Sequence, residues 1–151
     1  MSFPLPEPMR LALDEAAAAA RDGEVPVGAV VSRGAEILAV ARNRMREDGD
    51  PTAHAEMVAL RAAAAAIGDC RLDGCDLWVT LEPCAMCAGA IALARIARLY
   101  IGAPDPKGGA VLHGPRLFGQ PTCHHAPDVY SGMGESEAGA LLRAFFRARR
   151  S

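Results

Sequence analysis

The sequence predicts an α/β protein in which helices cover both faces of one mixed sheet, a three-layer α/β/α sandwich of about five strands. Two stretches alternate strand, helix and strand, a pattern typical of strands that run parallel. Ahead of them, two β-rich segments are joined by four turn-prone residues, which indicates an antiparallel hairpin at one side of the sheet. The chain has 151 residues and is expected to form one domain, residues 1–151.

The first third of the chain predicts a helix, a hairpin and a loop. Met9–Arg21 has apolar residues at helical spacing, and Gly23 follows as a stop. Its many alanines favour a helix that packs closely on a sheet. Val25–Val31 and Glu36–Ala41 are the two strands of the hairpin. Asn43–Pro51 is polar and turn-prone, so a loop is expected there.

The remaining chain predicts three helices and two strands. A helix at about His54–Ile67 ends before a glycine, and the strand Asp76–Leu81 follows it. A second helix, Cys84–Arg95, leads into the strand Ala97–Ile101. The last helix, about Glu135–Arg150, has acids in its first turn and arginines in its last, which complements the helix dipole.

The charge, the cysteine count and the lengths of the apolar runs limit the classes of function that this chain could have. The net charge is −2, so any nucleic-acid surface has to be local. Five cysteines are an odd number, which argues against a disulfide framework and favours a reduced, cytoplasmic protein. Acidic residues interrupt the first twenty positions, so no signal peptide is expected, and no apolar run approaches the ~18 residues of a membrane span.

One motif indicates a metal centre. Cys84 and Cys87 lie at the start of an apolar helical run, behind Pro83, so both sulfurs fall on one helical turn. Helix N-terminal N–H groups stabilise thiolates, the form of cysteine that binds metals. With His54 as the third ligand, zinc keeps a fourth position for water, which is typical of catalytic rather than structural sites.

The same cysteine pair also occurs in redox motifs and in zinc fingers. A finger needs a fourth protein ligand from a second cysteine or histidine pair, which the sequence lacks, and a redox motif has no use for His54 or Glu56. The combination of His54-x-Glu56 with Pro83-Cys84-x-x-Cys87 instead resembles the signature of the zinc deaminases. In those enzymes the glutamate binds no metal and serves as the general acid and base.

Residues 102–134 are rich in glycine and proline and too long for a simple connection. A second metal site at His113, Cys123, His124 and His125 is the less favoured interpretation, because adjacent residues do not easily converge on one tetrahedral ion. We expect a folded loop beside the active site.

The end of the last helix allows two interpretations. Ala138, Leu141, Leu142 and Phe145 form a core stripe, whereas Phe146 lies at its margin among several arginines. Such a helix end is most often simply solvated. The alternative is an aromatic ring and cations directed at an RNA base and its phosphates.

Nearly the whole chain resembles the bacterial tRNA adenosine deaminases of the TadA type, which have a cytidine deaminase-like fold and make inosine at the wobble position. The resemblance rests on Val25–Val30, Asn43–Arg44, Asp50–Glu56, Thr80–Ala90, Gly102–Ala110 and Phe145–Arg150. The zinc motif is shared with guanine, cytosine and cytidine deaminases, so it indicates the chemistry and leaves a small-molecule substrate as the alternative. The loop Leu112–Met133 departs from the best-known members.

The resemblance also implies roles for individual residues. His54, Cys84 and Cys87 would bind one Zn²⁺, and Glu56 would move the protons. Asn43 would hydrogen-bond the flipped base. Positions near the anticodon loop would be Asp105, Lys107, Phe146 and Arg149. The implied partners are a tRNA anticodon stem-loop and a second copy of the chain, because family members are homodimers.

Overall fold

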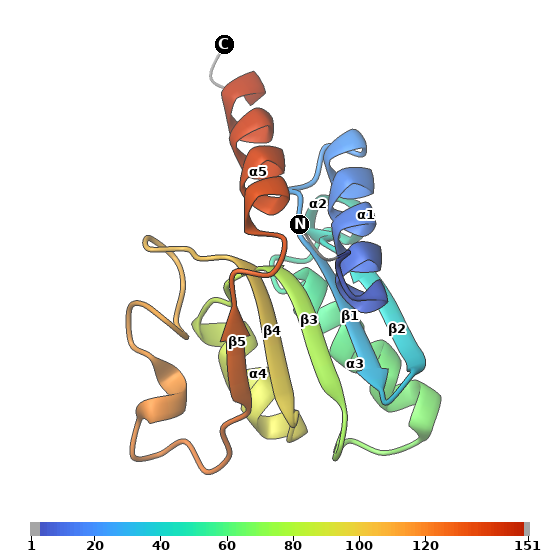
Figure 1. Cartoon of the computed structure of the whole chain (residues 1–151), viewed down its shortest axis with the longest axis vertical. Helices are drawn as coiled ribbons and strands as arrows, with labels where there is room; N and C mark the ends of the chain where they lie inside the picture. The colour runs from blue at the N-terminus through green and yellow to red at the C-terminus, as the bar shows by residue number, and fades with distance from the viewer. Residues whose placement is uncertain (1–3, 150–151) are drawn as a thin grey trace.

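The computed structural model describes residues 4–149 and contains a five-stranded sheet between two layers of helices (Figure 1). The strands are β1 (Gly28–Arg33), β2 (Glu36–Arg42), β3 (Asp76–Leu81), β4 (Arg98–Ala103) and β5 (Asp128–Ser131). They lie in the order β2-β1-β3-β4-β5. β1 runs antiparallel to both β2 and β3, whereas β3, β4 and β5 are parallel. The predicted three-layer sandwich with a mixed sheet is confirmed.

Helices cover the two faces of the sheet in pairs. α1 (Glu7–Arg21) and α5 (Glu135–Arg149) lie toward the viewer in Figure 1, and α3 (Ala55–Ile67) and α4 (Ala85–Ala94) lie behind the strands. Adjacent residues of a strand therefore pack into two different hydrophobic cores, one on each face of the sheet. Val31 and Val79 pack with α3 and α4, whereas Val30 and Trp78 pack with α1, as the period of two along a strand requires.

The order of the strands confirms the predicted topology. β3, β4 and β5 form the expected parallel core, and the β1–β2 hairpin lies at one side of it. Within the hairpin, β1 is the strand that pairs with β3. The physical reason is burial. Five of the six residues of β1 are buried, whereas β2 is only half-buried and occupies the edge.

Three further elements fall in segments for which the sequence predicted loops. α2 (Met45–Asp48) is a single helical turn within the polar segment after β2. β5 and a short 3₁₀ turn, Leu117–Gly119, lie within the long Gly- and Pro-rich stretch. The other predicted elements agree within a few residues, except that Arg150 lies outside the described residues.

The alanine-rich helix α1 packs closely on β1, as expected. A side chain at Gly28 would overlap the backbone carbonyl of Ala12, so only glycine allows this approach. Gly28 N–H also donates to Thr80 Oγ1 at 3.1 Å, which ties β1 to β3 close to the site.

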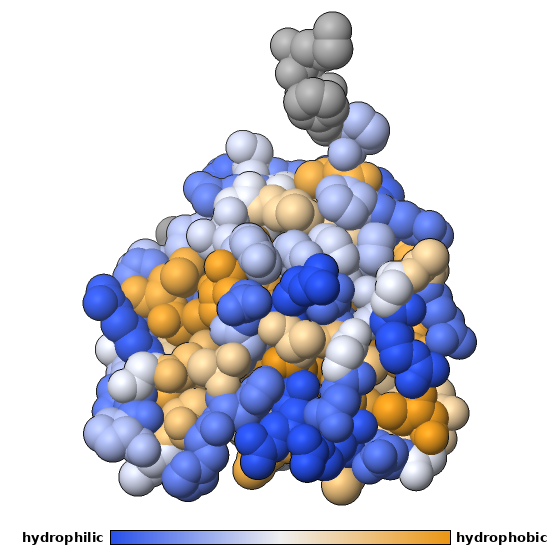
Figure 2. Space-filling view, turned by 60° about the horizontal axis from the view of Figure 1, so that its bottom comes forward, coloured by the Kyte–Doolittle hydropathy of each residue, from blue (hydrophilic) through white to orange (hydrophobic). Residues whose placement is uncertain are grey.

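Among the helices of residues 4–149, none has the length and apolar character that crossing a membrane would require. Figure 2 shows one face of the molecule, on which several apolar patches are separated by hydrophilic side chains.

Candidate metal centre and active site

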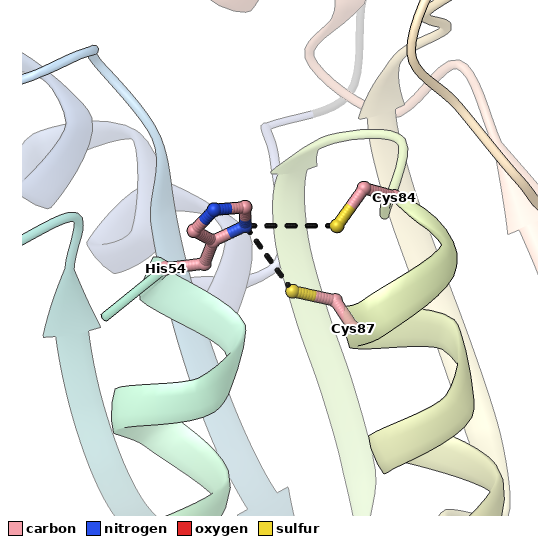
Figure 3. A group of neighbouring side chains, drawn as sticks. All are labelled: His54, Cys84 and Cys87. Atoms are coloured by element: carbon pink, nitrogen blue, oxygen red, sulfur yellow. Dashed lines mark hydrogen bonds between the residues drawn. The ribbon is translucent and has the colours of Figure 1, made fainter. Parts of the chain in front are cut away.

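Two helices begin at the same edge of the sheet and bring three metal-binding side chains together. His54 directly precedes α3, Cys84 directly precedes α4, and Cys87 lies in the first turn of α4. Figure 3 shows the imidazole pointing across the gap between the helices toward both sulfurs. β3 ends at Leu81, so the strand delivers Cys84 to this edge of the sheet after a connection of only two residues.

The spacing of these atoms fits zinc. His54 Nδ1 lies 3.6 Å from Cys84 Sγ and 3.5 Å from Cys87 Sγ. Zinc bonds of ~2.3 Å to sulfur and ~2.0 Å to nitrogen, at a tetrahedral angle, separate the two donors by about 3.5 Å. All three ligand atoms lie within 4.8 Å of one another. Within residues 4–149, no other group of three such side chains gathers in this way.

The two sulfurs differ in their electrostatics. A hydrogen bond from Cys87 and the backbone N–H groups of Met86 and Cys87 lower the pKa of Cys84 to about 5. Cys84 is therefore a thiolate at neutral pH before any metal arrives. Donation to Cys84 and burial raise the pKa of Cys87, which makes it the sulfur that depends on a metal to lose its proton.

Glu56 lies in the first turn of α3, buried beside the three ligands. Burial raises the pKa of Glu56 to about 7, against the lowering effects of a backbone N–H, of His54 and of Cys87. A carboxyl group with this pKa takes up and releases protons near neutral pH, which is what a general acid and base requires.

A pocket of about 200 Å³ opens in front of the ligands. Asn43, Glu56 and Asp105, which are far apart in the sequence, all line it. Apolar walls come from Val25, Val27, Met45 and Leu81. The volume is below the roughly 300–1,000 Å³ of sites for drug-sized ligands, so the pocket has room for about one base.

The other residues singled out from the sequence lie outside this pocket. Lys107 is exposed in the loop after β4, and its N–H donates to Asp105 Oδ1 at 3.2 Å. On α5, Phe146 is 45% exposed and lines a shallow groove with Arg143 and Arg147. The predicted core stripe of α5 is only partly buried, because just Ala138 and Phe145 are enclosed.

Arg149 has partners within the chain. Its guanidinium lies 3.5 Å from the centre of the Phe145 ring, and Nη2 donates to the carbonyl of Gly23 at 3.3 Å. These contacts fix the end of α5 on the turn after α1. Arg149 thus has a structural role that the sequence did not indicate.

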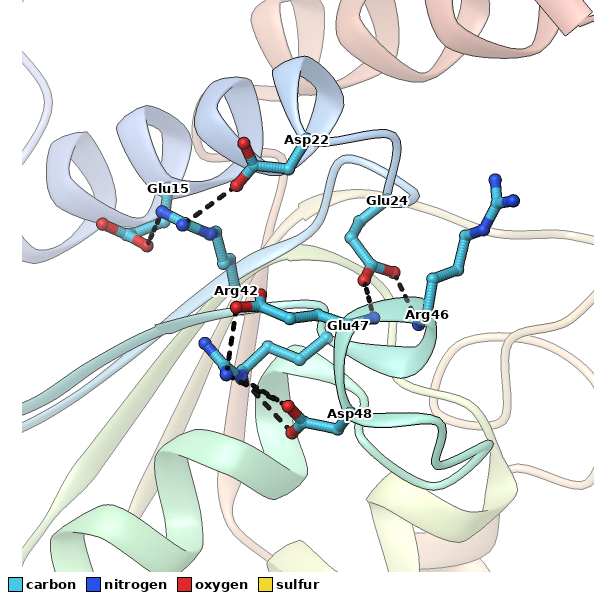
Figure 4. A network of polar contacts seen from close by, with 8 residues as sticks. Glu15, Asp22, Glu24, Arg42, Arg46, Glu47 and Asp48 are labelled. Atoms are coloured by element: carbon cyan, nitrogen blue, oxygen red, sulfur yellow. Dashed lines mark hydrogen bonds and ion pairs between the residues drawn. The ribbon is translucent and has the colours of Figure 1, made fainter.

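Sequence reasoning missed two buried acids that support the site. The first is Glu24, which is 2% exposed. Its carboxylate accepts the backbone N–H groups of Arg46 at 3.1 Å and Glu47 at 2.8 Å, at the start of α2 (Figure 4). Because α2 begins two residues after Asn43 and carries Met45, Glu24 holds that wall of the pocket in place.

The second acid is Glu82, between the end of β3 and Cys84. It is also 2% exposed and accepts N–H groups from the loop after β4. Burial alone would raise its pKa, but these N–H groups and His113 outweigh burial and lower the pKa of Glu82. The sequence did contain one signal for Glu82, since it is an acidic residue between an apolar strand and the metal-ligand motif.

Three of the four residues considered for a second metal have partners within the protein. His113 Nδ1 lies 2.8 Å from Glu82 Oε1. His125 Nε2 lies 2.7 Å from the carbonyl oxygen of Ile96, and Cys123 Sγ donates to the carbonyl of His125 at 3.2 Å. These contacts hold the long loop against α4 and the sheet, in agreement with a folded loop.

Comparison with known proteins decides the family. The sequence profile of the cytidine and deoxycytidylate deaminase zinc-binding region matches residues 5–103. A tRNA-specific adenosine deaminase from Agrobacterium fabrum is 59% identical over 142 residues, which cover 94% of this chain and 93% of the relative. The chain belongs to this family of zinc deaminases.

Solved structures agree with this assignment. The deaminase superposes with a TM-score of 0.88 on a structure from a study of A-to-I editing by tRNA:A34 deaminases, with 58% identity, covering 89% of this chain and 98% of the other. A guanine deaminase from Bacillus subtilis is 37% identical, with a TM-score of 0.63, and covers 64% of this chain and 62% of the other. The deaminase is therefore a zinc enzyme, and the His54, Cys84 and Cys87 group fits one Zn²⁺ per chain.

Proposed function

We propose that this zinc deaminase converts adenosine to inosine at the wobble position of a tRNA anticodon, in the cytoplasm. The observation that carries the proposal is the 59% identity, over nearly the whole chain, to a protein named a tRNA-specific adenosine deaminase. The pocket supports it, because it has room for about one base in front of the ligand group. Formation of inosine in an anticodon stem-loop is the activity that tests it.

In this proposal His54, Cys84 and Cys87 hold the zinc ion, which when bound supplies a Lewis acid that activates water near neutral pH. Glu56 takes a proton from the attacking water and gives it to the ring nitrogen. It then takes the proton of the hydroxyl group formed at the attacked carbon and gives it to the amino group, which leaves as ammonia. The amide of Asn43 both donates and accepts hydrogen bonds, so it can hold the edge of the base in the pocket.

Beyond the catalytic group, the proposed contacts to RNA are Asp105, Lys107, Phe146 and Arg149. Asp105 lines the pocket, and Lys107 is exposed two residues farther along the same loop. On α5, the exposed ring of Phe146 stands beside Arg143 and Arg147, an arrangement that offers a stacking surface and charges for phosphates.

Replacing Phe146 by alanine is expected to weaken binding of an anticodon stem-loop. Stacking of a base on an aromatic ring contributes about 1–3 kcal/mol, so the Kd should rise roughly 5- to 150-fold. Zinc content should be unchanged. The matched control is Tyr130→Ala, because Tyr130 is an aromatic residue of similar exposure, 48%, that lies on β5 and not on α5.

Salt dependence tests the arginines in the same titrations. Affinity for the wild type should fall steeply as salt rises, because each phosphate that is neutralised releases counterions. Equal affinity for Phe146→Ala and wild type, with no salt dependence, would remove α5 from the RNA-binding surface.

We also propose a homodimer, formed through the surface of α4. Leu93 is 81% exposed and borders two apolar hollows. One hollow includes Leu60, Ala64 and Ala90, and the other lies along the 117–125 loop. A leucine this exposed between apolar surfaces is typical of an interface, and a second copy of the chain is the partner that the family implies.

Leu93→Asp is expected to produce a monomer. The substitution removes an apolar anchor and places a charge in the proposed interface, so the dimer Kd should rise roughly 100-fold or more. Light scattering at micromolar concentration measures the mass. Val40→Asp is the control, since Val40 is 43% exposed on the edge strand β2. A wild-type protein that is monomeric at these concentrations would rule out the dimer.

A free base is the alternative substrate, because the pocket has room for one base whether or not RNA is attached. The guanine deaminase from Bacillus subtilis is less similar to this chain than the tRNA-specific adenosine deaminase from Agrobacterium fabrum, at 37% against 59% identity. A free base also has no use for the exposed ring and arginines of α5.

A further inference from the structure

The loop that follows β4 forms one wall of the pocket without helix or strand structure of its own. Asp105 and Gly108 line the pocket, and Lys107 is exposed beside them. Between Ala103, where β4 ends, and Leu117, no residue belongs to a helix or strand. The position of this wall therefore depends on contacts from elsewhere in the protein.

Those contacts converge on a single side chain, Glu82. Its Oε1 accepts the N–H of Asp105 at 2.9 Å, at the start of the loop. Its Oε2 accepts three consecutive N–H groups farther along, those of Val111 at 3.2 Å, Leu112 at 2.8 Å and His113 at 3.1 Å. The carboxylate thus holds both ends of the segment that carries Lys107.

Two further features show that this arrangement is closely packed. His113 Nδ1 lies 2.8 Å from Glu82 Oε1, so an imidazole closes the cage around a carboxylate with no exposed surface. A side chain at Gly109 would overlap both the Glu82 carboxylate and the backbone carbonyl of Asp105. Glycine is therefore required at this position for the loop to close over Glu82.

The backbone at Glu82 and Pro83 also connects this part of the protein to the metal centre. Glu82 N–H donates to the carbonyl of Ala103 at 2.9 Å, and the carbonyl of Pro83 accepts the N–H of Ala110 at 2.9 Å. Cys84 is the next residue in the chain. Glu82 therefore fixes the substrate-facing loop relative to the turn that presents the zinc ligand.

We propose that Glu82 is a positioning residue that holds the 105–113 loop against the pocket and thereby sets the affinity for the RNA substrate. Its contribution is to KM, because the loop carries Asp105 and Lys107, whereas Glu56 and the ligand group come from α3 and α4. The substrate part of this inference rests on the proposed function. The part that concerns the loop does not.

Glu82→Gln is the decisive variant, because glutamine has the same shape but replaces one acceptor oxygen with an NH₂ group that faces backbone donors. Amide hydrogen exchange should become faster at Asp105, Val111, Leu112 and His113, and should stay unchanged in α3. KM for an anticodon stem-loop should rise roughly tenfold or more, with kcat within about threefold of wild type. Zinc content should be retained.

Asp76→Asn is the matched control, because it makes the same acid-to-amide change at the opposite end of strand β3. It should leave both amide hydrogen exchange in the loop and KM unchanged.

Gly109→Ala should reproduce the effects of Glu82→Gln without altering the carboxylate. His113→Ala, which removes one donor and leaves four backbone N–H groups, should accelerate exchange in the loop alone and serves as the test if Glu82→Gln does not fold.

The outcomes separate the inference from the proposed function. Faster loop exchange with a raised KM supports both. Faster loop exchange in a protein whose wild type makes no inosine supports the positioning role and contradicts the proposed substrate. Unchanged loop exchange in Glu82→Gln and His113→Ala would overturn the inference. A loss of zinc together with a fall in kcat at unchanged KM would also overturn it, because Glu82 would then act through Cys84.

Discussion

Replacing Glu56 by alanine is expected to remove nearly all turnover while the protein stays folded and keeps its zinc. The carboxyl group is buried beside the ligand group but is not part of it, and its pKa of about 7 suits proton transfer in both directions. General acid–base groups contribute roughly 10²- to 10⁴-fold to rates, and a group that serves several transfers belongs at the upper end of that range. Single-turnover kinetics on an anticodon stem-loop measure the loss.

The control for this variant is Glu36→Ala, which removes an exposed acid of the β1–β2 hairpin that pairs with Arg33. Its rate and zinc content should match those of the wild type. If Glu56→Ala retained a tenth of wild-type activity, Glu56 would have a structural role and another group would have to move the protons.

Cys87→Ser is expected to lose zinc and thermal stability together. Serine keeps the size of the side chain but does not lose its proton readily, and only a deprotonated ligand binds zinc well. Removing a direct ligand should weaken zinc binding by more than the roughly 10- to 100-fold typical of supporting residues. Metal analysis after dialysis and a thermal melt measure the two effects.

Cys75→Ser provides the comparison, because Cys75 is also buried but lies outside the ligand group. That variant should keep its zinc even if its melting temperature falls. Equal zinc contents in Cys87→Ser and wild type would remove Cys87 from the metal centre.

Local sequence patterns predicted the four long helices and the cysteine pair of the metal centre, because both depend on neighbouring residues. α3, for example, ends at Ile67, and the next residue is Gly68 with a φ of 72°, a backbone conformation that glycine adopts without strain. Cys84 and Cys87 fall on one turn because their spacing is that of a helix. Their meeting with His54 came from the resemblance, and the helix starts in the structure now account for it.

Contacts between distant segments were not predictable in the same way. The position of β1 between β2 and β3 depends on pairing across the sheet, which the hairpin sequence does not specify. β5 has four residues, of which three are exposed, so it lacks the alternation that marks a strand. Arg149 was assigned to RNA from the resemblance, and its hydrogen bond to the carbonyl of Gly23 forms only because α5 packs beside α1.

Glu24 and Glu82 illustrate the same limit within the site. Both are acids that accept hydrogen bonds from backbone N–H groups. Every residue except proline has such a group, so the sequence does not reveal which of them will face a given carboxylate. Those N–H groups lie 22 or more residues away along the chain. An acid that holds a loop therefore looks like any exposed acid until the fold is known.

The most direct test of the proposed activity is a comparison of two substrates with the same purified protein. One is an anticodon stem-loop with adenosine at the wobble position, in which inosine is measured. The other is free guanine, cytosine or adenine, from which ammonia release is measured. We expect inosine in the stem-loop and little or no ammonia from the free bases. Faster turnover of a free base, with no inosine in the stem-loop, would contradict the assignment and indicate a small-molecule deaminase.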